Sequence, residues 1–143
     1  MATATLNATN SQSVTITLAS LSNGSTAVSN AIDNSSNKFL SANVRVKVKT
    51  GASGVSATGS CSVFLVRSTD GGTDYDDSTN AAFLGSLPTA ANATTYARTF
   101  STELVGSIGT HWKVAVVNNS GAALDSTAGN HEVEFSGLKY DIA

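Results

Sequence analysis

The stretch FLSANVRVKVKT, residues 39–50, is the clearest structural signal in the chain, because apolar and polar residues alternate along it. The apolar set is Leu40, Ala42, Val44, Val46 and Val48, and the set between them is Asn43, Arg45, Lys47 and Lys49. A period of two places successive side chains on opposite faces of a β-strand. The stretch therefore predicts a half-buried strand with a basic outer row. We interpret this row as a solvated face that discourages edge pairing.

Strand-like patterns continue on both sides of this stretch. Residues 13–18 alternate, residues 94–100 alternate less cleanly, and residues 111–118 place Trp112 on the face of Val114 and Val116. Residues 61–68, CSVFLVRS, are apolar on both faces, which is typical of a central strand covered on two sides. We expect Trp112 to lie in the core.

The last stretch, HEVEFSGLKYDI at residues 131–142, changes phase. Its apolar residues are odd-numbered up to Phe135 and even-numbered from Leu138 onward. One extra residue at Ser136-Gly137 would restore the register, and glycine is common in such bulges. The pattern predicts a β-bulge at this point.

No stretch has a sustained helical period, although residues 81–87 could form a short helical turn that Gly85 and Pro88 would end. The fold class is therefore all-β: an antiparallel β-sandwich of jelly-roll or Greek-key type with about 7–8 strands. We expect residues 1–12 to be a flexible N-terminal arm and residues 13–143 to be a single β-sandwich domain.

Composition bounds the function. Only 13% of the 143 residues are charged, with a net charge of −2 and eight Lys and Arg, so binding to nucleic acid is not expected. No apolar run approaches the ~20 residues that span a bilayer, and residues 1–13 have no features of a secretory signal. The single cysteine, Cys61, lies in an apolar run and is expected to be a small buried side chain.

The stretch RSTDGGTDYDDS, residues 67–78, is the richest in candidate ligands. An EF-hand loop starting at Asp70 fails, because position 6 would be Tyr75 instead of glycine. A looser calcium site remains an alternative, formed by Asp70, Asp74, Asp76 and Asp77. The preferred interpretation is an acidic turn, so no metal site is assigned.

This stretch also resembles the Asp-box of sialidases and other β-proteins. Ser68, Asp70 and Gly72 match that motif, Tyr75 takes the place of its tryptophan, and Asp74 replaces its threonine. The resemblance implies a hairpin turn away from any catalytic centre, in which the aspartate accepts backbone N–H groups, glycine adopts positive φ and the aromatic ring packs beneath.

No catalytic constellation is present in the sequence. His111 and His131 each stand at the start of an expected strand, and alternation separates His131 from Glu132 and Glu134. The two glutamates share a face and are a conceivable acid pair, but nothing marks them as buried. We therefore expect no enzymatic activity, no catalytic or cofactor-binding residues and no cofactor.

The chain as a whole resembles small virion proteins of tailed bacteriophages. The resemblance covers the Thr/Ser/Asn-rich arm, the VRVKVK strand, the SVFLVRSTDGG turn and the closing EFSGLKYDI strand. It implies a non-enzymatic capsid cement or decoration protein, assembled in the bacterial host cytoplasm, that binds the major capsid protein and stabilises the head lattice. The implied oligomer is a homotrimer, with neither membrane nor nucleic acid as a partner.

The alternative is a carbohydrate-binding β-sandwich module, associated with a phage tail or fibre or with a cell surface. Sugars stack on exposed aromatic rings, and the candidates are Trp112, Tyr75, Tyr96 and Tyr140. Of these, we expect Trp112 to lie in the core and only Tyr75 to be exposed.

Overall fold

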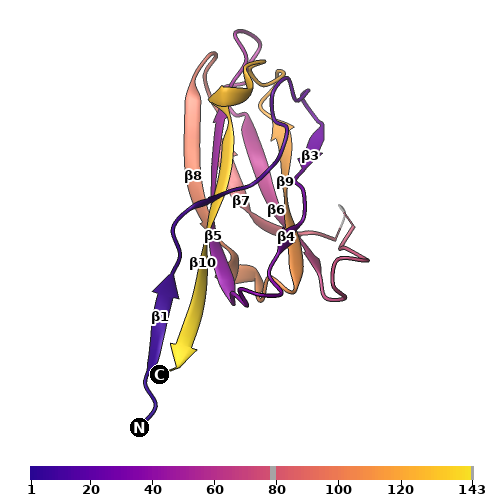
Figure 1. The fold of residues 1–143 in the computed structure, drawn as a ribbon. Coiled ribbons are helices and arrows are strands. Elements are labelled where there is room, and N and C mark those ends of the chain that lie inside the picture. The colour runs from indigo at the N-terminus through magenta and orange to yellow at the C-terminus, as the bar shows by residue number, and fades with distance from the viewer. Residues whose placement is uncertain (78–79, 143) are drawn as a thin grey trace.

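The computed structural model describes residues 1–77 and 80–142. Two antiparallel sheets pack face to face, with two short 3-10 helices between strands (Figure 1). The elements are β1 Ala4–Ala8, β2 Gln12–Ser13, β3 Thr26–Val28, β4 Ile32–Asp33, β5 Ser41–Lys49, β6 Ser60–Ser68, β7 Ala82–Pro88, β8 Thr95–Ser101, η1 Thr102–Val105, β9 His111–Asn119, η2 Ala128–Asn130 and β10 Glu132–Ile142.

The ten strand segments formed by the described residues fill eight positions, because β1 and β2 pair with the same side of β10, and β3 and β4 both pair with β9. Sheet A has the order β1/β2-β10-β5-β8, and sheet B has the order β3/β4-β9-β6-β7. In the described part of the chain, β6 and β7 are neighbours within one sheet, whereas the later steps β7 to β8, β8 to β9 and β9 to β10 each change sheet. This is the arrangement of an eight-stranded jelly roll. It confirms the predicted antiparallel sandwich.

The core lies between the two sheets. Trp112 is fully buried and packs edge-on against Phe135, with ring centroids 5.0 Å apart. The apolar face of β5 is also fully buried, as its alternation predicts: Ala42, Val44, Val46 and Val48. Leu40, which the alternation placed on the same face, precedes the strand and is 56% exposed, whereas its neighbour Phe39 is buried at 5%, so the prediction for Leu40 is wrong. Cys61 is buried among these side chains, and its burial raises the pKa of the thiol to about 11. The predicted core positions of Trp112 and Cys61 are therefore confirmed.

Strand β10 does not contain the predicted bulge. Its register against β5 runs unbroken from Glu132 to Leu138. The extra residue lies instead in the N-terminal segment, because Ala8 pairs with Leu138 and Gln12 with Phe135, so that residues 9–11 face residues 136–137. The bulge predicted at Ser136-Gly137 is wrong, and the phase change therefore turns the apolar side of the strand from the inner to the outer face.

Gly137 is required for another reason. A Cβ atom at this position would lie 2.4–2.5 Å from ring atoms of Phe39, which packs directly on the glycine. Real Cβ contacts are not that short, so an alanine would force the ring or the strand to move. The glycine allows close approach of an aromatic ring.

Three other expectations differ from the structure. The stretch 81–87 forms no helical turn: its residues 82–87 belong to the edge strand β7, and Pro88 ends that strand. Strand β5 lies between β10 and β8, so its basic row does not protect an edge. Residues 14–18 have the expected burial, with Val14 and Leu18 in the core, but they cross between sheets without forming a strand (Figure 1).

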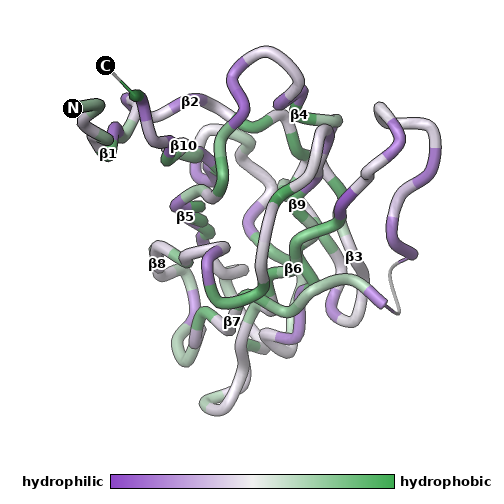
Figure 2. Tube along the Cα trace, turned by 90° about the horizontal axis from the view of Figure 1, so that it is seen from below, coloured by the Kyte–Doolittle hydropathy of each residue, from purple (hydrophilic) through white to green (hydrophobic). Residues whose placement is uncertain are grey.

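The segment expected to be a flexible arm, residues 1–12, contains strand β1, which pairs with the last five residues of β10. Both strands extend past the body of the sandwich as a two-stranded ribbon (Figures 1 and 2). Within residues 1–77 and 80–142, no helix has the length and apolar character needed to cross a membrane.

Candidate interaction surfaces

The acidic stretch after β6 forms a compact turn. The carboxylate of Asp70 accepts hydrogen bonds from the Ser68 hydroxyl (2.7 Å) and from the backbone N–H groups of Thr73 and Asp74 (3.1 Å each). The Gly72 N–H donates to the Ser68 hydroxyl, and Gly72 has a φ of +89°. These contacts are the ones that the Asp-box resemblance implies, so the turn interpretation is confirmed for residues 67–77; Ser78 lies outside the described residues.

The carboxylates of the turn are engaged locally and do not converge. The Ser68 hydroxyl and the Asp74 N–H hold the pKa of Asp70 below its ordinary value, and Asp76 pairs with Arg67 at 3.5 Å. Asp77 accepts hydrogen bonds from Asn80. Among the described residues, no group of three or more acidic, histidine or cysteine side chains is arranged to hold a metal ion. The alternative calcium site from Asp70 to Asp77 has no geometric support in this part of the chain.

The aromatic residue of the turn is covered. Tyr75 is half-buried, and the ammonium group of Lys113 on β9 lies 3.9 Å from its ring centroid. Lys113 is opposite Val66 on the outer face of sheet B, so the turn folds back over this end of the sheet. The expectation that Tyr75 is exposed is therefore wrong. The exposed tyrosine is Tyr140, at 59%.

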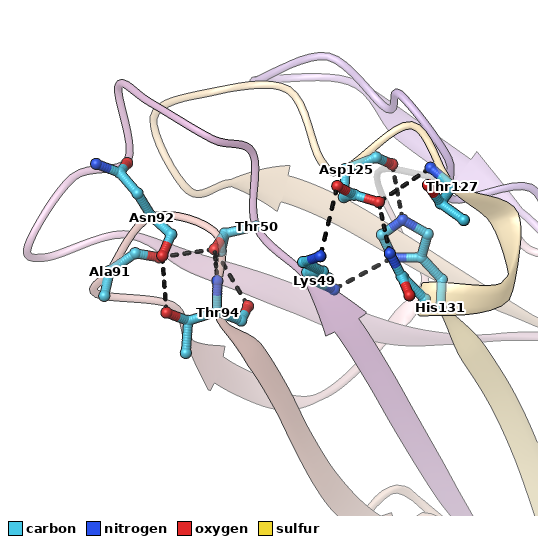
Figure 3. A network of polar contacts seen from close by, with 9 residues as sticks. Lys49, Thr50, Ala91, Asn92, Thr94, Asp125, Thr127 and His131 are labelled. Carbon is cyan, nitrogen blue, oxygen red and sulfur yellow. Dashed lines mark hydrogen bonds and ion pairs between the residues drawn. The ribbon is translucent and has the colours of Figure 1, made fainter.

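Both histidines have structural contacts. At the end of the sandwich away from the ribbon, His131 Nδ1 accepts the Lys49 N–H at 3.3 Å and Nε2 lies 2.8 Å from the Asp125 carbonyl oxygen (Figure 3). These two contacts fix the Nε2–H tautomer. The Asp125 carboxylate accepts from Asn130 and from the Thr127 N–H, which lowers its pKa.

The other histidine, His111, lies 3.5 Å from Asp33 through Nε2. A second polar cluster in Figure 3 connects the end of β5 to the loop between β7 and β8. The Thr50 hydroxyl donates to the Ala91 carbonyl at 2.7 Å and accepts the Thr94 N–H at 2.9 Å. Each of these contacts fixes a loop at an end of the sandwich. None of them forms a nucleophile–base pair.

The outer face of sheet A is polar and its charges are paired. Arg45 lies 3.5 Å from Glu134, and Lys47 lies 3.2 Å from Glu132, across the β5–β10 pair. The hydrogen bond from Lys47 is the largest cause of the lowered pKa of Glu132. The two glutamates considered as an acid pair are therefore ion-pair partners of the basic row. This pairing neutralises the row that the sequence presents as basic.

The outer face of sheet B has the opposite character. A row of apolar residues crosses four strands in register, and we call it the outer apolar row: Val28, Ala115, Phe64 and Phe83. The rings of Phe64 and Phe83 lie 5.4 Å apart, and Phe83 is 53% and Val28 50% exposed. Strand β6 is thus apolar on both faces, as the sequence shows, but no described segment covers Phe83 and Val28. The exposure along the row is interrupted at Ala115, which is only 3% exposed, so the row presents the Phe64–Phe83 pair on one side and Val28 on the other. Large apolar side chains left exposed on one face are typical of an interaction surface.

The terminal ribbon carries a second apolar surface. Its even-numbered residues share one face, which we call the ribbon stripe: Ala4, Leu6, Ala8, Leu138, Tyr140 and Ile142. Leu6, Leu138 and Tyr140 line a shallow groove together with Leu40. The odd-numbered residues are polar, and there Lys139 lies 3.5 Å from Asp141. The ribbon is amphipathic, with its apolar face on the outer side of sheet A.

No protein-family model matches the chain, and no curated protein matches it.

Sequence reasoning assigned no functional residues and missed both apolar surfaces. The signals were present: residues 61–68 are apolar on both faces, and the phase of β10 changes at residue 136. The apolar outer face of residues 61–68 was interpreted as a face covered by another part of the same chain. The phase change in β10 was attributed to a bulge, which would have kept the apolar residues on the inner face.

Proposed function

We propose that this chain is a non-enzymatic structural protein of a virion, and that it is a capsid cement or decoration protein that binds the major capsid protein and stabilises the head lattice. The observation that carries this proposal is the outer apolar row on sheet B. A subunit that docks on a lattice needs a surface that loses water on contact, and the Phe83 ring, which is 53% exposed and tilted against the ring of Phe64, supplies part of one.

The contrast between the two sheets supports the same proposal. Over the body of the sandwich, the outer face of sheet A pairs its charges within the monomer, through Arg45–Glu134 and Lys47–Glu132. The outer face of sheet B leaves large apolar side chains in water. Over the body of the sandwich, a polar face opposite an apolar face is expected of a protein that sits on a shell with its polar side outward.

The decisive experiment measures attachment to phage heads that were assembled without this protein. Phe83→Gln places a polar side chain in the outer apolar row, and Thr99→Gln is the matched control on an exposed position of sheet A. We expect at least a tenfold loss of affinity for Phe83→Gln and none for Thr99→Gln. Equal binding of the wild type and Phe83→Gln would contradict the docking surface, and absence of wild-type binding would contradict the cement role.

The carbohydrate-binding module is the second candidate, and the exposure of Tyr140 is the observation in its favour. The other aromatic candidates do not add to it, because Trp112 is buried and Tyr75 is covered by Lys113. Tyr96 is half-buried, and its hydroxyl accepts the Ala91 N–H at 2.9 Å. A glycan array separates the two: micromolar binding lost on Tyr140→Ala would favour the module.

A further inference from the structure

The ribbon stripe has an unusual place in the fold. Up to residue 137 the inner face of β10 is apolar and packs on the core, with Val133 and Phe135 buried. Beyond that point no sheet lies beneath the strand, and the inner positions become Lys139 and Asp141. The apolar residues move to the outer face, where Tyr140 and Ile142 are 59% and 77% exposed. This inversion is unfavourable for an isolated monomer and indicates that something covers the stripe from outside.

Shape and charge both favour a copy of the same chain as the cover. The stripe has small side chains on its β1 side, where Ala4 and Ala8 flank Leu6, so this side is low. Its β10 side has large side chains at every position and is raised along its whole length. Turned by a two-fold axis, the raised side of one ribbon fits over the low side of the other. No charged residue belongs to the stripe itself, and the one charged residue that lines its groove is Glu103, at the side of Leu40 and Ser41.

We propose that two copies of this chain associate through their ribbon stripes, packed face to face around a two-fold axis, so that the four strands form a small two-layer sandwich. The layers of such a sandwich lie about 10 Å apart. The contact produces a dimer, or a hexamer where the expected trimer also forms. It uses a surface distinct from the outer apolar row, and it is independent of the proposed attachment to a lattice.

The area is sufficient for a specific but weak contact. Four large side chains of the stripe and its groove are more than half exposed: Leu6, Leu40, Tyr140 and Ile142. With about 100 Å² for an aliphatic side chain and about 200 Å² for tyrosine, they expose about 300 Å² per copy. Since apolar atoms form roughly 60% of an interface, two copies bury about 1,000 Å² in total, the lower limit for a specific interface. The dimer is therefore expected at micromolar concentrations.

The test uses the full chain and a matched pair of variants on adjacent residues of β1. Leu6→Lys introduces a charge into the stripe, and Thr5→Lys introduces the same charge on the opposite face of the same strand. Both side chains are exposed, so the sandwich is expected to fold in either variant. Near-ultraviolet circular dichroism of the buried Trp112 checks this.

Sedimentation equilibrium from 1 µM to 1 mM then measures the assembly. We expect an even-numbered wild-type assembly, at least a tenfold weaker association for Leu6→Lys and less than a twofold change for Thr5→Lys. A wild type that stays monomeric or purely trimeric at 1 mM would overturn the proposal. An even-numbered assembly that is insensitive to Leu6→Lys, or equally sensitive to Thr5→Lys, would also overturn it. The Phe83→Gln variant is expected to show the same masses in sedimentation equilibrium as the wild type, even if it no longer attaches to heads. The ribbon contact and the head attachment are therefore tested independently of each other.

Discussion

Substitution of Gly137 by alanine tests the account of β10 most directly. The added Cβ would lie 2.4–2.5 Å from the Phe39 ring, which is itself 5% exposed. The ring has little freedom to move, because Asn34 accepts the Phe39 N–H at 2.8 Å and donates to its carbonyl at 3.0 Å. Overpacking at a fixed site costs about 3 kcal/mol, at the upper end of the usual range.

Alanine also restricts the unfolded chain, which offsets about 0.5–1 kcal/mol of that cost. The net loss is therefore about 2 kcal/mol in the free energy of unfolding, or roughly 8 °C in Tm for a chain of 143 residues. Gly129→Ala is the matched control, because no atom lies within 4 Å of its added Cβ. We expect that variant to be unchanged or slightly stabilised.

Urea unfolding followed by Trp112 fluorescence measures both variants, and a double-mutant cycle with Phe39→Leu identifies the cause. If the ring is responsible, Gly137→Ala costs at least 1 kcal/mol less in the Phe39→Leu background, as expected for residues in contact. The reasoning is refuted if Gly137→Ala costs less than about 0.5 kcal/mol, the usual effect of a neutral surface change. It is also refuted if the cost is the same in both backgrounds.

Three further outcomes are expected. Asn34→Ala should lower the free energy of unfolding by about 2–4 kcal/mol in urea titrations, because it leaves buried backbone groups of Phe39 and Gly109 unpaired. Thermal stability should fall as the pH drops below about 4, because the lowered pKa values of Asp70 and Asp125 contribute stability that is present above the unfolded value of 3.8 and is lost as the pH falls through their folded values; a pH-independent Tm between pH 5 and pH 2 would contradict this. Deletion of residues 1–11, which removes β1 and with it half of the ribbon stripe, should leave a folded domain by circular dichroism but weaken the association of two copies, and an unchanged dissociation constant would exclude a role for this segment.

The sequence predicted the parts of the fold in which one periodicity is sustained. Strand β5 keeps its period of two for nine residues, so its buried face was correctly predicted. Trp112 shares the parity of two valines, and its complete burial follows from that. The turn after β6 was predicted from local contacts alone, since Asp70 bonds to residues within four positions of it.

The parts that were not predicted depend on neighbours distant in sequence. The alternation in residues 14–18 predicts which of their side chains are buried. It cannot predict whether another strand pairs with this segment. From the sequence alone, Gly137 is indistinguishable from a glycine in a β-bulge. Its actual role depends on the ring of Phe39, which lies 98 residues earlier in the chain and packs on it. The basic row of β5 gave no sign that the glutamates of β10 would lie beside it. The two apolar surfaces were missed because a sequence shows which side chains are apolar and not which of them remain uncovered.

The pairing of Ala4 with Ile142 has a practical consequence for engineering. Because the two chain ends meet across one ribbon, a short Asn-Gly turn could join them into a hairpin. New ends could then be opened at residues 53–54, which are exposed in the loop at the far end of β5. A reporter fused next to Ala4 or Ile142 would sit beside the ribbon stripe and obstruct it, whereas the same reporter on the permuted ends would leave the stripe free. The circular permutant is thus the form in which a cargo can be displayed without disturbing association through the ribbon.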